Sequence, residues 1–298
     1  MSRYSIKDLE QLTGIKAHTI RIWEKRYNIV SPERTDTNIR YYNDMQLKRL
    51  LNVSLLNKNG FKISKLASMS NDELCKAIDN LDSGLSNQAL QIEHLISAMV
   101  SIDEVSFNQT ITKSMVKNGF EYTLFNLIYP FFDRVGLLWL TGVINPAREH
   151  FVSSIIKQKI YTAYDKIITP IAKDAPVAIL SLHENEFHEI TLLISNYIAR
   201  KLGFKTIYLG QSVPYESLAD VLQYTKSNLL ITNFVTAQDG KFIESYLQKI
   251  ATDFPKLTVL AGGFQIANQS LTLPSNVMKT QSAEELKENL THIYNSKS

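Results

Sequence analysis

The sequence predicts a multidomain α and α/β protein with a winged helix-turn-helix head, a four-helix bundle and a doubly wound, parallel five-stranded sheet. Three observations support this prediction. The first 70 residues are basic and contain two short amphipathic helical patterns around a glycine turn. The middle of the chain has only helical periodicity, and from residue 177 strand patterns alternate with helical ones. We place the three domains at 1–75, 76–172 and 173–298 of the 298-residue chain.

Positive charge is concentrated in the head. Residues 1–70 contain thirteen Lys or Arg and six Asp or Glu, a net charge of +7, whereas the whole chain carries +3. The rest of the chain therefore carries −4. A basic head on a mildly acidic body indicates that the head alone meets a polyanion.

The remaining composition argues against several classes of protein. No apolar stretch approaches the ~20 residues of a membrane span, and the N-terminus lacks the apolar core of a signal peptide. The single cysteine, Cys75, excludes an intramolecular disulfide and a cysteine-based zinc finger. We therefore expect a cytoplasmic protein that has no contact with a membrane.

The head has the pattern of a helix-turn-helix. Ser5 precedes a predicted helix from Ile6 to Leu12, and Asp8 is placed to complete a capping box with it. Thr13-Gly14-Ile15 forms the turn, and the second helix runs from Lys16 to Lys25. An apolar stripe should dock this second helix, and donors at its N-terminal end can reach base edges and phosphates.

In the second helix, Ile20 and Trp23 are expected to face the core. Together with the segments around it, this helix resembles a MerR-type DNA-binding domain almost continuously over residues 3–70. The segments are Ile6-Lys7-Asp8-Leu9, Thr13-Gly14-Ile15, Thr19 to Tyr27, Ser31-Pro32-Glu33-Arg34 and Ile39-Arg40-Tyr41-Tyr42.

The resemblance implies double-stranded operator DNA as a partner and a wing between Tyr27 and Tyr42. It implies contacts to the DNA backbone from Arg21, Tyr27, Arg34 and Arg40, with Lys16, His18 and Thr19 nearest the bases. Asn38 stands where the family's wing has glycine, and asparagine tolerates the left-handed conformation that such a turn needs.

Members of that family dimerise through a long helix after the head. Here the helical pattern of residues 71–116 breaks at Ser83-Gly84 and again near residues 101–103. The sequence thus favours several shorter helices, and assembly into a homodimer or homotetramer through the body of the chain.

Residues 72–170 are predicted to be wholly helical and to form a bundle of about four helices. Residues 85–100 have apolar side chains at helical spacing, and residues 122–140 are apolar nearly all round, as in a buried helix. Pro146 opens a further helix over 147–168, at a favoured first-turn position.

The C-terminal part has the alternation of a Rossmann-like fold. Strands are expected at 177–182, 205–209, 229–234, 257–261 and 277–279, and helices at 189–202, 215–224, 241–253 and 283–294. Regular alternation with short links implies right-handed crossovers and a parallel sheet. Neither a Gly-x-Gly-x-x-Gly fingerprint nor a phosphate-binding P-loop is present.

His188 directly follows the first of these strands. A histidine in such a loop projects from the carboxyl edge of the sheet, where open α/β folds bind ligands. Imidazole suits a borderline metal such as cobalt, and the neighbouring Glu186 can fix its tautomer. Taken alone, a surface or core role is commoner for a histidine beside a helix start. Ser212, Thr232 and Gly262-Gly263 end later strands and outline a slot along the same edge.

The spacing of these residues resembles the cobalamin-binding domain of methionine synthases and mutases. That family has Asp-x-His-x-x-Gly, then Ser-x-Leu, then Gly-Gly. At closely matching intervals this chain has Glu186-x-His188-x-x-Thr191, Thr232-Asn233-Phe234 and Gly262-Gly263. The resemblance implies that His188 is the lower axial ligand to the cobalt of a cobalamin. It also implies that Ser212, Thr232, Gly262 and Gly263 line the pocket for the nucleotide tail.

Two positions depart from that pattern. Glu186 replaces an aspartate and can still accept a hydrogen bond from the histidine ring. Thr191 replaces a glycine that allows close backbone approach, and its β-branched side chain argues against tight cobalamin binding.

Trp139 and the pair Glu149-His150 form a second pattern in the helical segment. Taken alone, they have the character of bundle core and of a helix-surface pair. Placed between the head and the histidine-bearing α/β domain, they resemble the four-helix cap of the light-sensing CarH and LitR regulators. The resemblance implies that Trp139 covers the upper face of the corrin and that Glu149 and His150 flank the upper ligand.

The sequence as a whole predicts a transcriptional regulator, not an enzyme, whose oligomerisation and DNA affinity are controlled by bound adenosylcobalamin or methylcobalamin. It would act as a photoreceptor or as a sensor of the cofactor. Thr191 keeps open an alternative, a regulator of the same fold that needs no cofactor and is controlled by a protein partner. A cobalamin-dependent enzyme for methyl transfer or rearrangement is disfavoured, because no length remains for a substrate barrel and the chain carries a DNA-binding head.

Overall fold

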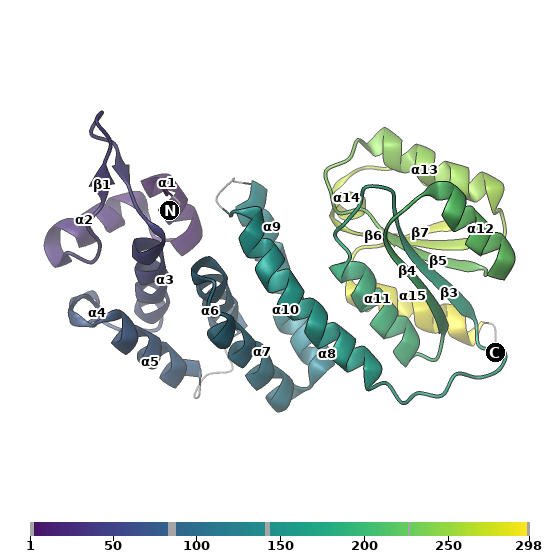
Figure 1. The fold of residues 1–298 in the computed structure, drawn as a ribbon, viewed down its shortest axis with the longest axis horizontal. Coiled ribbons are helices and arrows are strands. Elements are labelled where there is room, and N and C mark those ends of the chain that lie inside the picture. Colours follow the sequence, from purple (N-terminus) through teal and green to yellow (C-terminus); the bar gives the residue numbers. More distant parts are fainter. Residues whose placement is uncertain (1–2, 83–87, 141–143, 226, 297–298) are drawn as a thin grey trace. The chain divides into compact units, whose positions relative to one another are not determined.

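The computed structural model describes residues 3–82, 88–140, 144–225 and 227–296 (Figure 1). It divides into two compact units, Met1–Ile155 and Ile156–Ser298, and the division falls within one helix, α10 (Pro146–Asp165). The three-domain boundaries expected from the sequence, after residues 75 and 172, stay predictions. No helix among the described residues combines the length and apolar character needed to cross a bilayer.

The first two helices of the head form where the sequence predicts them. α1 (Ile6–Thr13) begins after Ser5, whose hydroxyl accepts from the Asp8 amide while the Asp8 carboxylate accepts from the Ser5 amide. This reciprocal pair is the predicted capping box. Gly14 ends α1 at φ +71°, a left-handed conformation that glycine adopts without strain. α2 (Ala17–Tyr27) follows and extends two residues beyond its predicted end.

A two-stranded antiparallel wing follows α2. β1 (Glu33–Arg34) pairs with β2 (Arg40–Tyr41), and the turn between them holds Asn38 at φ +64°. The Arg34 guanidinium donates to Asn38 Oδ1 at 2.7 Å, which braces the turn. The expectation that asparagine can replace glycine in this left-handed position is confirmed.

α3 (Asp44–Lys58) joins the head to the bundle within the first unit. It packs against α1, α4 (Ile63–Ser68), α5 (Asn71–Asp82) and α6 (Gln88–Ser101). Its buried residues lie on nearly all sides of the helix: Leu47, Leu50, Leu51, Asn52, Val53, Ser54, Leu55 and Leu56. A helix buried all round is a core helix, so the head and the bundle share one core.

Among the described residues the bundle contains four helical segments, in agreement with the predicted number of about four. They are α6, α7 (Glu104–Asn118), a continuous segment over 120–140, and α10. The continuous segment consists of α8 (Phe120–Thr123), one π-helical turn, η1 (Leu124–Ile128), and α9 (Tyr129–Leu140). Phe131 of α9 packs edge-on against Phe107 of α7, with ring centroids 5.5 Å apart.

The second unit contains a parallel sheet with the strand order β4-β3-β5-β6-β7. The strands are β3 (Val177–His183), β4 (Lys205–Val213), β5 (Leu229–Asn233), β6 (Thr258–Gly262) and β7 (Val277–Thr280). The helices are α11 (Ile190–Lys201), α12 (Tyr215–Thr225), α13 (Gly240–Asp253), α14 (Phe264–Asn268) and α15 (Ala283–Asn295). The predicted doubly wound sheet is confirmed, and α14 is an additional short helix.

Different helices cover the two faces of this sheet (Figure 1). Ile179 of β3 and Leu230 of β5 belong to the apolar cluster that α12 and α13 complete. Because side chains alternate along a strand, Leu180 and Asn233 point to the opposite face, where α11 and α15 pack together. The winding reverses between β3 and β5, and doubly wound sheets bind ligands at the carboxyl ends of such a strand pair.

Candidate functional site

His188 lies at this reversal point, in the loop that joins β3 to α11. Its Nδ1 is 2.7 Å from Glu186 Oε1 and 3.1 Å from the Thr236 hydroxyl, and its side chain is 50% exposed. A ring held through Nδ1 presents Nε2 as its metal-binding atom, the usual arrangement for a histidine ligand backed by a carboxylate. Among the described residues, no group of three or more His, Cys, Asp or Glu side chains could hold a metal ion.

Glu186 anchors the His188 loop and has no exposed side-chain surface. Its Oε2 accepts from the backbone N–H groups of Val235 at 3.0 Å and Thr236 at 2.7 Å, and its Oε1 accepts from the His188 N–H at 3.0 Å. Burial by itself would raise the pKa of this carboxyl. Hydrogen bonds from the His188 ring and the three backbone groups outweigh burial and lower the pKa to about 2. The carboxylate is thus charged at neutral pH and ties the end of β5 to the histidine.

Ser212, near the end of β4, forms hydrogen bonds with the same loop. Its hydroxyl accepts from the Asn185 N–H at 3.1 Å, and its own N–H donates to the Glu186 carbonyl at 3.0 Å. Ser212 makes these bonds at φ +51°, an uncommon conformation for a residue other than glycine. Its predicted place in a nucleotide pocket stays a prediction.

Four buried polar atoms near this edge have no hydrogen-bond partner among the described residues. They are the Thr191 and Thr232 hydroxyls, the Asn233 amide nitrogen and His183 Nε2. Thr191 lies in the first turn of α11, His183 ends β3, and Thr232 and Asn233 end β5. A buried polar group left unpaired costs about 1–3 kcal/mol, so such groups usually have water or a ligand as partner. These atoms therefore offer hydrogen bonds to a polar molecule bound at the edge.

Gly262 and Gly263 are needed by the packing of the protein itself. A Cβ on Gly262 would lie 2.6 Å from Thr280 Oγ1 and 2.7 Å from Asn233 Oδ1. Gly263 has φ +97°, and a Cβ there would lie 2.5 Å from the Phe234 carbonyl oxygen. Any side chain at either position would displace the end of β5 or β7, so both glycines keep this edge closely packed.

Glu189, the residue after His188, connects the loop to the C-terminal half of α10. Its carboxylate lies 3.0 Å from Lys157 Nζ and accepts from the Tyr208 hydroxyl at 2.9 Å. Burial and the nearby Glu189 charge both raise the pKa of Tyr208, which keeps its proton and donates it. Sequence reasoning missed Lys157 and Tyr208 because each comes from a distant segment without a motif of its own.

The cap residues lie on two helices of the bundle. Trp139 is in the last turn of α9, and its side chain is outside the part of the chain that the structure describes. Glu149 and His150 lie near the start of α10, with the Glu149 carboxylate 2.9 Å from His150 Nδ1 and the His150 side chain 76% exposed. Because these residues and His188 belong to different units, a common site for all of them stays a prediction.

The residues predicted to contact DNA surround α2 and the wing. Lys16, His18, Arg21 and Arg34 are exposed, and Thr19, Tyr27 and Arg40 are partly buried. Lys16 pairs with Glu10 at 3.0 Å, and Arg40 Nε lies 3.4 Å from the Glu24 carboxylate. The head thus presents cationic side chains from both the helix and the wing, and their contacts to DNA stay predictions.

One of the two expected core residues of α2 differs from the expectation. Ile20 is fully buried, but Trp23 is only partly buried and is not a core residue. The core of the head is completed instead by Tyr42, whose hydroxyl donates to Glu24. The sequence carried no sign of this bond, because its partners lie in two separate segments, eighteen positions apart.

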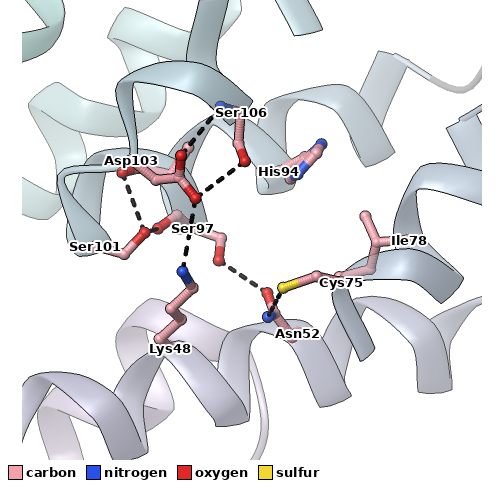
Figure 2. Close-up of a pocket in the computed structure, with 10 residues that line it drawn as sticks. Lys48, Asn52, Cys75, Ile78, His94, Ser97, Ser101, Asp103 and Ser106 are labelled. Carbon is pink, nitrogen blue, oxygen red and sulfur yellow. Dashed lines mark hydrogen bonds and ion pairs between the residues drawn. The ribbon is translucent and has the colours of Figure 1, made fainter. Parts of the chain in front are cut away.

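A small polar cavity lies where α3 meets the bundle, and Figure 2 shows the side chains around it. Its volume is about 30 Å³, which holds water but no organic ligand. Lys48 Nζ lies 3.7 Å from the Asp103 carboxylate. The Asn52 side chain accepts from Ser97 at 2.9 Å and donates to the Cys75 sulfur at 3.7 Å. These contacts join α3 to α5, to α6 and to the start of α7, so we interpret the cavity as part of a structural joint.

Comparison with known families and proteins agrees with these features. Residues 4–73 match the MerR HTH family regulatory proteins, and residues 91–164 match the B12 binding domain family. The HTH-type transcriptional repressor CarH of Myxococcus xanthus is 23% identical over 271 residues, which cover 87% of this chain and 88% of CarH. The HTH-type transcriptional repressor CarA of the same organism is 22% identical and is matched over 87% of this chain and 85% of its own.

The fold also occurs in a solved corrinoid protein. The monomethylamine corrinoid protein of Methanosarcina barkeri superposes with a TM-score of 0.55 over 66% of this chain and 94% of its own. The two are 13% identical, so this likeness concerns the fold alone. The predicted combination of a MerR-type head, a helical bundle and a Rossmann-like sheet is thereby confirmed.

Proposed function

For a MerR-type transcriptional regulator with a B12-binding domain, we propose that bound cobalamin controls oligomerisation and DNA affinity, with His188 as the lower axial ligand to cobalt. The observation that carries the proposal is the His188 ring held through Nδ1 by a buried, charged Glu186. A corrin supplies four nitrogen ligands to its cobalt, so one imidazole from the protein is enough. The carboxylate fixes the tautomer and orients Nε2 for that bond.

The residues around His188 fit such a ligand chemically. Thr191, Thr232 and Asn233 carry buried polar atoms without partners, and the nucleotide tail of a cobalamin carries phosphate, hydroxyl and ring-nitrogen groups that could pair with them. Together with Ser212, Gly262 and Gly263, they would form the tail site. The hydroxyl of Thr191 then acts as a hydrogen-bonding group at the position where the resemblance expects a glycine.

Adenosylcobalamin and methylcobalamin supply a cobalt–carbon bond that light breaks. We therefore assign this chain a light-sensing role, in which Trp139, Glu149 and His150 would serve the upper side of the cofactor, as the resemblance to the four-helix cap implies. CarH and CarA are named as transcriptional repressors, which supports a regulatory role for this chain and not a catalytic one.

DNA binding would occur through paired heads of a homo-oligomer. Two heads on one duplex raise affinity through effective concentration without any new base contact. A change in oligomeric state is then enough to switch occupancy of the operator. As a DNA-binding regulator, the protein would act in the cytoplasm.

One observation favours a second candidate, a regulator of the same fold that works without a cofactor. The side chains of Asn233 and Thr280 fill the space over Gly262, and Thr191 adds bulk where the resemblance expects glycine. In that case a protein partner, and not a corrinoid, would control the DNA-binding head.

Absorption spectroscopy of the purified full chain separates these candidates. Loaded with adenosylcobalamin or methylcobalamin in the dark, the wild type should show the spectrum of a histidine-ligated cobalamin. His188→Ala should lose that spectrum and keep its fold, because the side chain is half-exposed in a loop. His292→Ala, a change at an exposed histidine of α15, is the matched control and should behave like the wild type.

Illumination of the loaded protein and a substitution at Thr191 provide a second set of tests. Illumination of the loaded protein should change both its sedimentation and its DNA affinity, and Thr191→Gly should leave cobalamin affinity equal or raise it. If the wild type binds no cobalamin at tens of micromolar, about −6 to −7 kcal/mol, the cofactor-independent candidate stands.

A further inference from the structure

Arg148, in the first turn of α10, is a buried arginine bonded to the DNA-binding head. Its side chain is 9% exposed, and its guanidinium donates to the Tyr4 hydroxyl and to Asp44 Oδ1. The Tyr4 hydroxyl donates to that same Asp44 oxygen at 2.9 Å, which closes a three-membered network. Burial alone would lower the pKa of Arg148, but its hydrogen bonds to Asp44 and Tyr4 raise it. Breaking such a link leaves a charge buried without its partner, so the link is costly to open.

A further set of bonds continues from this network into the recognition elements. Tyr4 and Tyr42 exchange backbone hydrogen bonds of 2.9 Å in both directions, which fixes the end of the wing. The buried Tyr42 side chain then donates to Glu24 of α2, and Glu24 pairs with Arg40 of the wing at 3.4 Å. The position of Arg148 is thus connected, through two tyrosines, to the helix and the wing that the resemblance assigns to DNA.

The same helix continues into the second unit. Lys157 of α10 lies 3.0 Å from Glu189, the residue that follows His188. Arg148 and Lys157 are nine positions apart, about 14 Å along a helix. Each contact lies within its own unit, and α10 is the element that the two contacts have in common.

We propose that Arg148 is a positioning residue that sets the recognition helix and wing from α10, so that the state of the sensor region reaches DNA affinity through the Arg148–Asp44–Tyr4 network. Arg148 itself does not contact DNA in this scheme. A packed polar network that shares one helix can carry a change from one region to another. Such a path is demonstrated when its members are energetically coupled.

Arg148→Gln in the full chain tests the proposal without any cofactor. The full chain is needed because α3 shares its core with the bundle. The probe is a duplex selected from a random library by the wild-type protein, and the readout is its dissociation constant at fixed salt. We expect Arg148→Gln to weaken binding about tenfold, within the usual range of couplings between sites. Lys58→Gln, which removes the exposed Lys58–Glu93 contact between α3 and α6, is the control and should stay within twofold of the wild type.

A double-mutant cycle shows whether the effect passes through the head. Asp44→Asn alone should also weaken DNA binding, and adding it to Arg148→Gln should cause little further loss. Unchanged DNA affinity in Arg148→Gln, additive losses in the double variant, or an equal loss in Lys58→Gln would each overturn the proposal. If Arg148→Gln does not fold, Tyr4→Phe removes only the shared hydroxyl and provides the same test.

This inference and the cobalamin proposal can fail independently. The DNA measurements above use the unloaded protein, so they hold even if no cobalamin binds. If cobalamin binds and changes DNA affinity in the wild type, Arg148→Gln should still bind it with the same spectrum but lose most of that change. A full cofactor response in Arg148→Gln would refute the path through Arg148 and leave the cofactor proposal intact.

Discussion

Glu186 in the second unit and Glu24 in the first are both largely buried carboxylates, 0% and 10% exposed, but they are held in different ways. Glu186 accepts hydrogen bonds from three backbone N–H groups in addition to side chains. The contacts of the Glu24 carboxylate are made by side chains, those of Tyr42 and Arg40. Backbone donors cannot leave without unfolding the loop, whereas side-chain donors can exchange partners. The first arrangement suits a fixed ligand site, and the second suits a DNA-binding surface that must respond.

The largest effect that tests this contrast is expected from Glu186→Gln. The variant removes a charge that several donors stabilise, and we expect it to lower the free energy of unfolding by about 2 kcal/mol at pH 7. This value is smaller than the full pKa shift suggests, because the amide oxygen of glutamine can still accept some of the hydrogen bonds that the carboxylate accepts. Chemical denaturation of both proteins at pH 7 provides the measurement.

The same substitution has a defined dependence on pH. The folded-state pKa of about 2 lies below the ordinary value of 4.5, so the charged carboxylate contributes its full stability above about pH 5 and loses it as the pH falls toward 2. The difference between wild type and Glu186→Gln should therefore shrink over that window. A difference that stays constant from pH 7 to pH 2.5 would show that the carboxylate charge does not matter.

An intermediate effect is expected from Tyr42→Phe in the head. It removes the hydroxyl that bonds Glu24 and leaves the buried ring in place, so we expect a loss of about 1–2 kcal/mol in unfolding free energy. DNA affinity should fall as well, since Glu24 of α2, which pairs with Arg40 of the wing, loses the bond from Tyr42 that holds it in place. Tyr41→Phe is the matched control, because the Tyr41 hydroxyl bonds Glu33 on the exposed wing and not Glu24. If Tyr41→Phe and Tyr42→Phe lower stability and DNA affinity equally, the bond to Glu24 has no special role in the head.

The smallest effect is expected from Arg40→Ala, measured as the salt dependence of DNA binding. If Arg40 leaves Glu24 to contact a phosphate, its loss should reduce the slope of log K against log salt by about 0.9. Lys25→Ala provides an exposed comparison on α2. An unchanged slope in Arg40→Ala would mean that Arg40 stays on Glu24 in the complex and serves the wing only.

Much of the architecture was predictable, for reasons that are local. The capping box of Ser5 and Asp8, the turn at Gly14 and the left-handed Asn38 depend on short-range backbone chemistry, and all three are confirmed. The five strands were predictable because apolar runs between turn residues are characteristic of a buried parallel sheet. Trp23 was misplaced because helical spacing alone does not say how wide the buried stripe is.

In the histidine site, too, the local features were predictable from the sequence and a contact from a distant segment was not. The position of His188 after the first strand, and of Glu186 two residues before it, follows from sequence spacing and the rule for sheet edges. Thr236 forms hydrogen bonds with both residues and was not identified from the sequence. It comes from the loop after β5, and only the pairing of β5 with β3 brings that loop to His188.

The sequence by itself determined the features whose cause lies within a few positions. These are the helix caps, the places of the polar residues that follow the strands, and the basic character of the head. Folding in three dimensions decided the contacts between segments far apart in the chain. Arg148 meets Tyr4 and Asp44 across more than one hundred positions, and Lys157 meets Glu189 across thirty-two. No periodicity encodes such pairs, because a buried charge selects its partner by proximity and desolvation after the helices have packed.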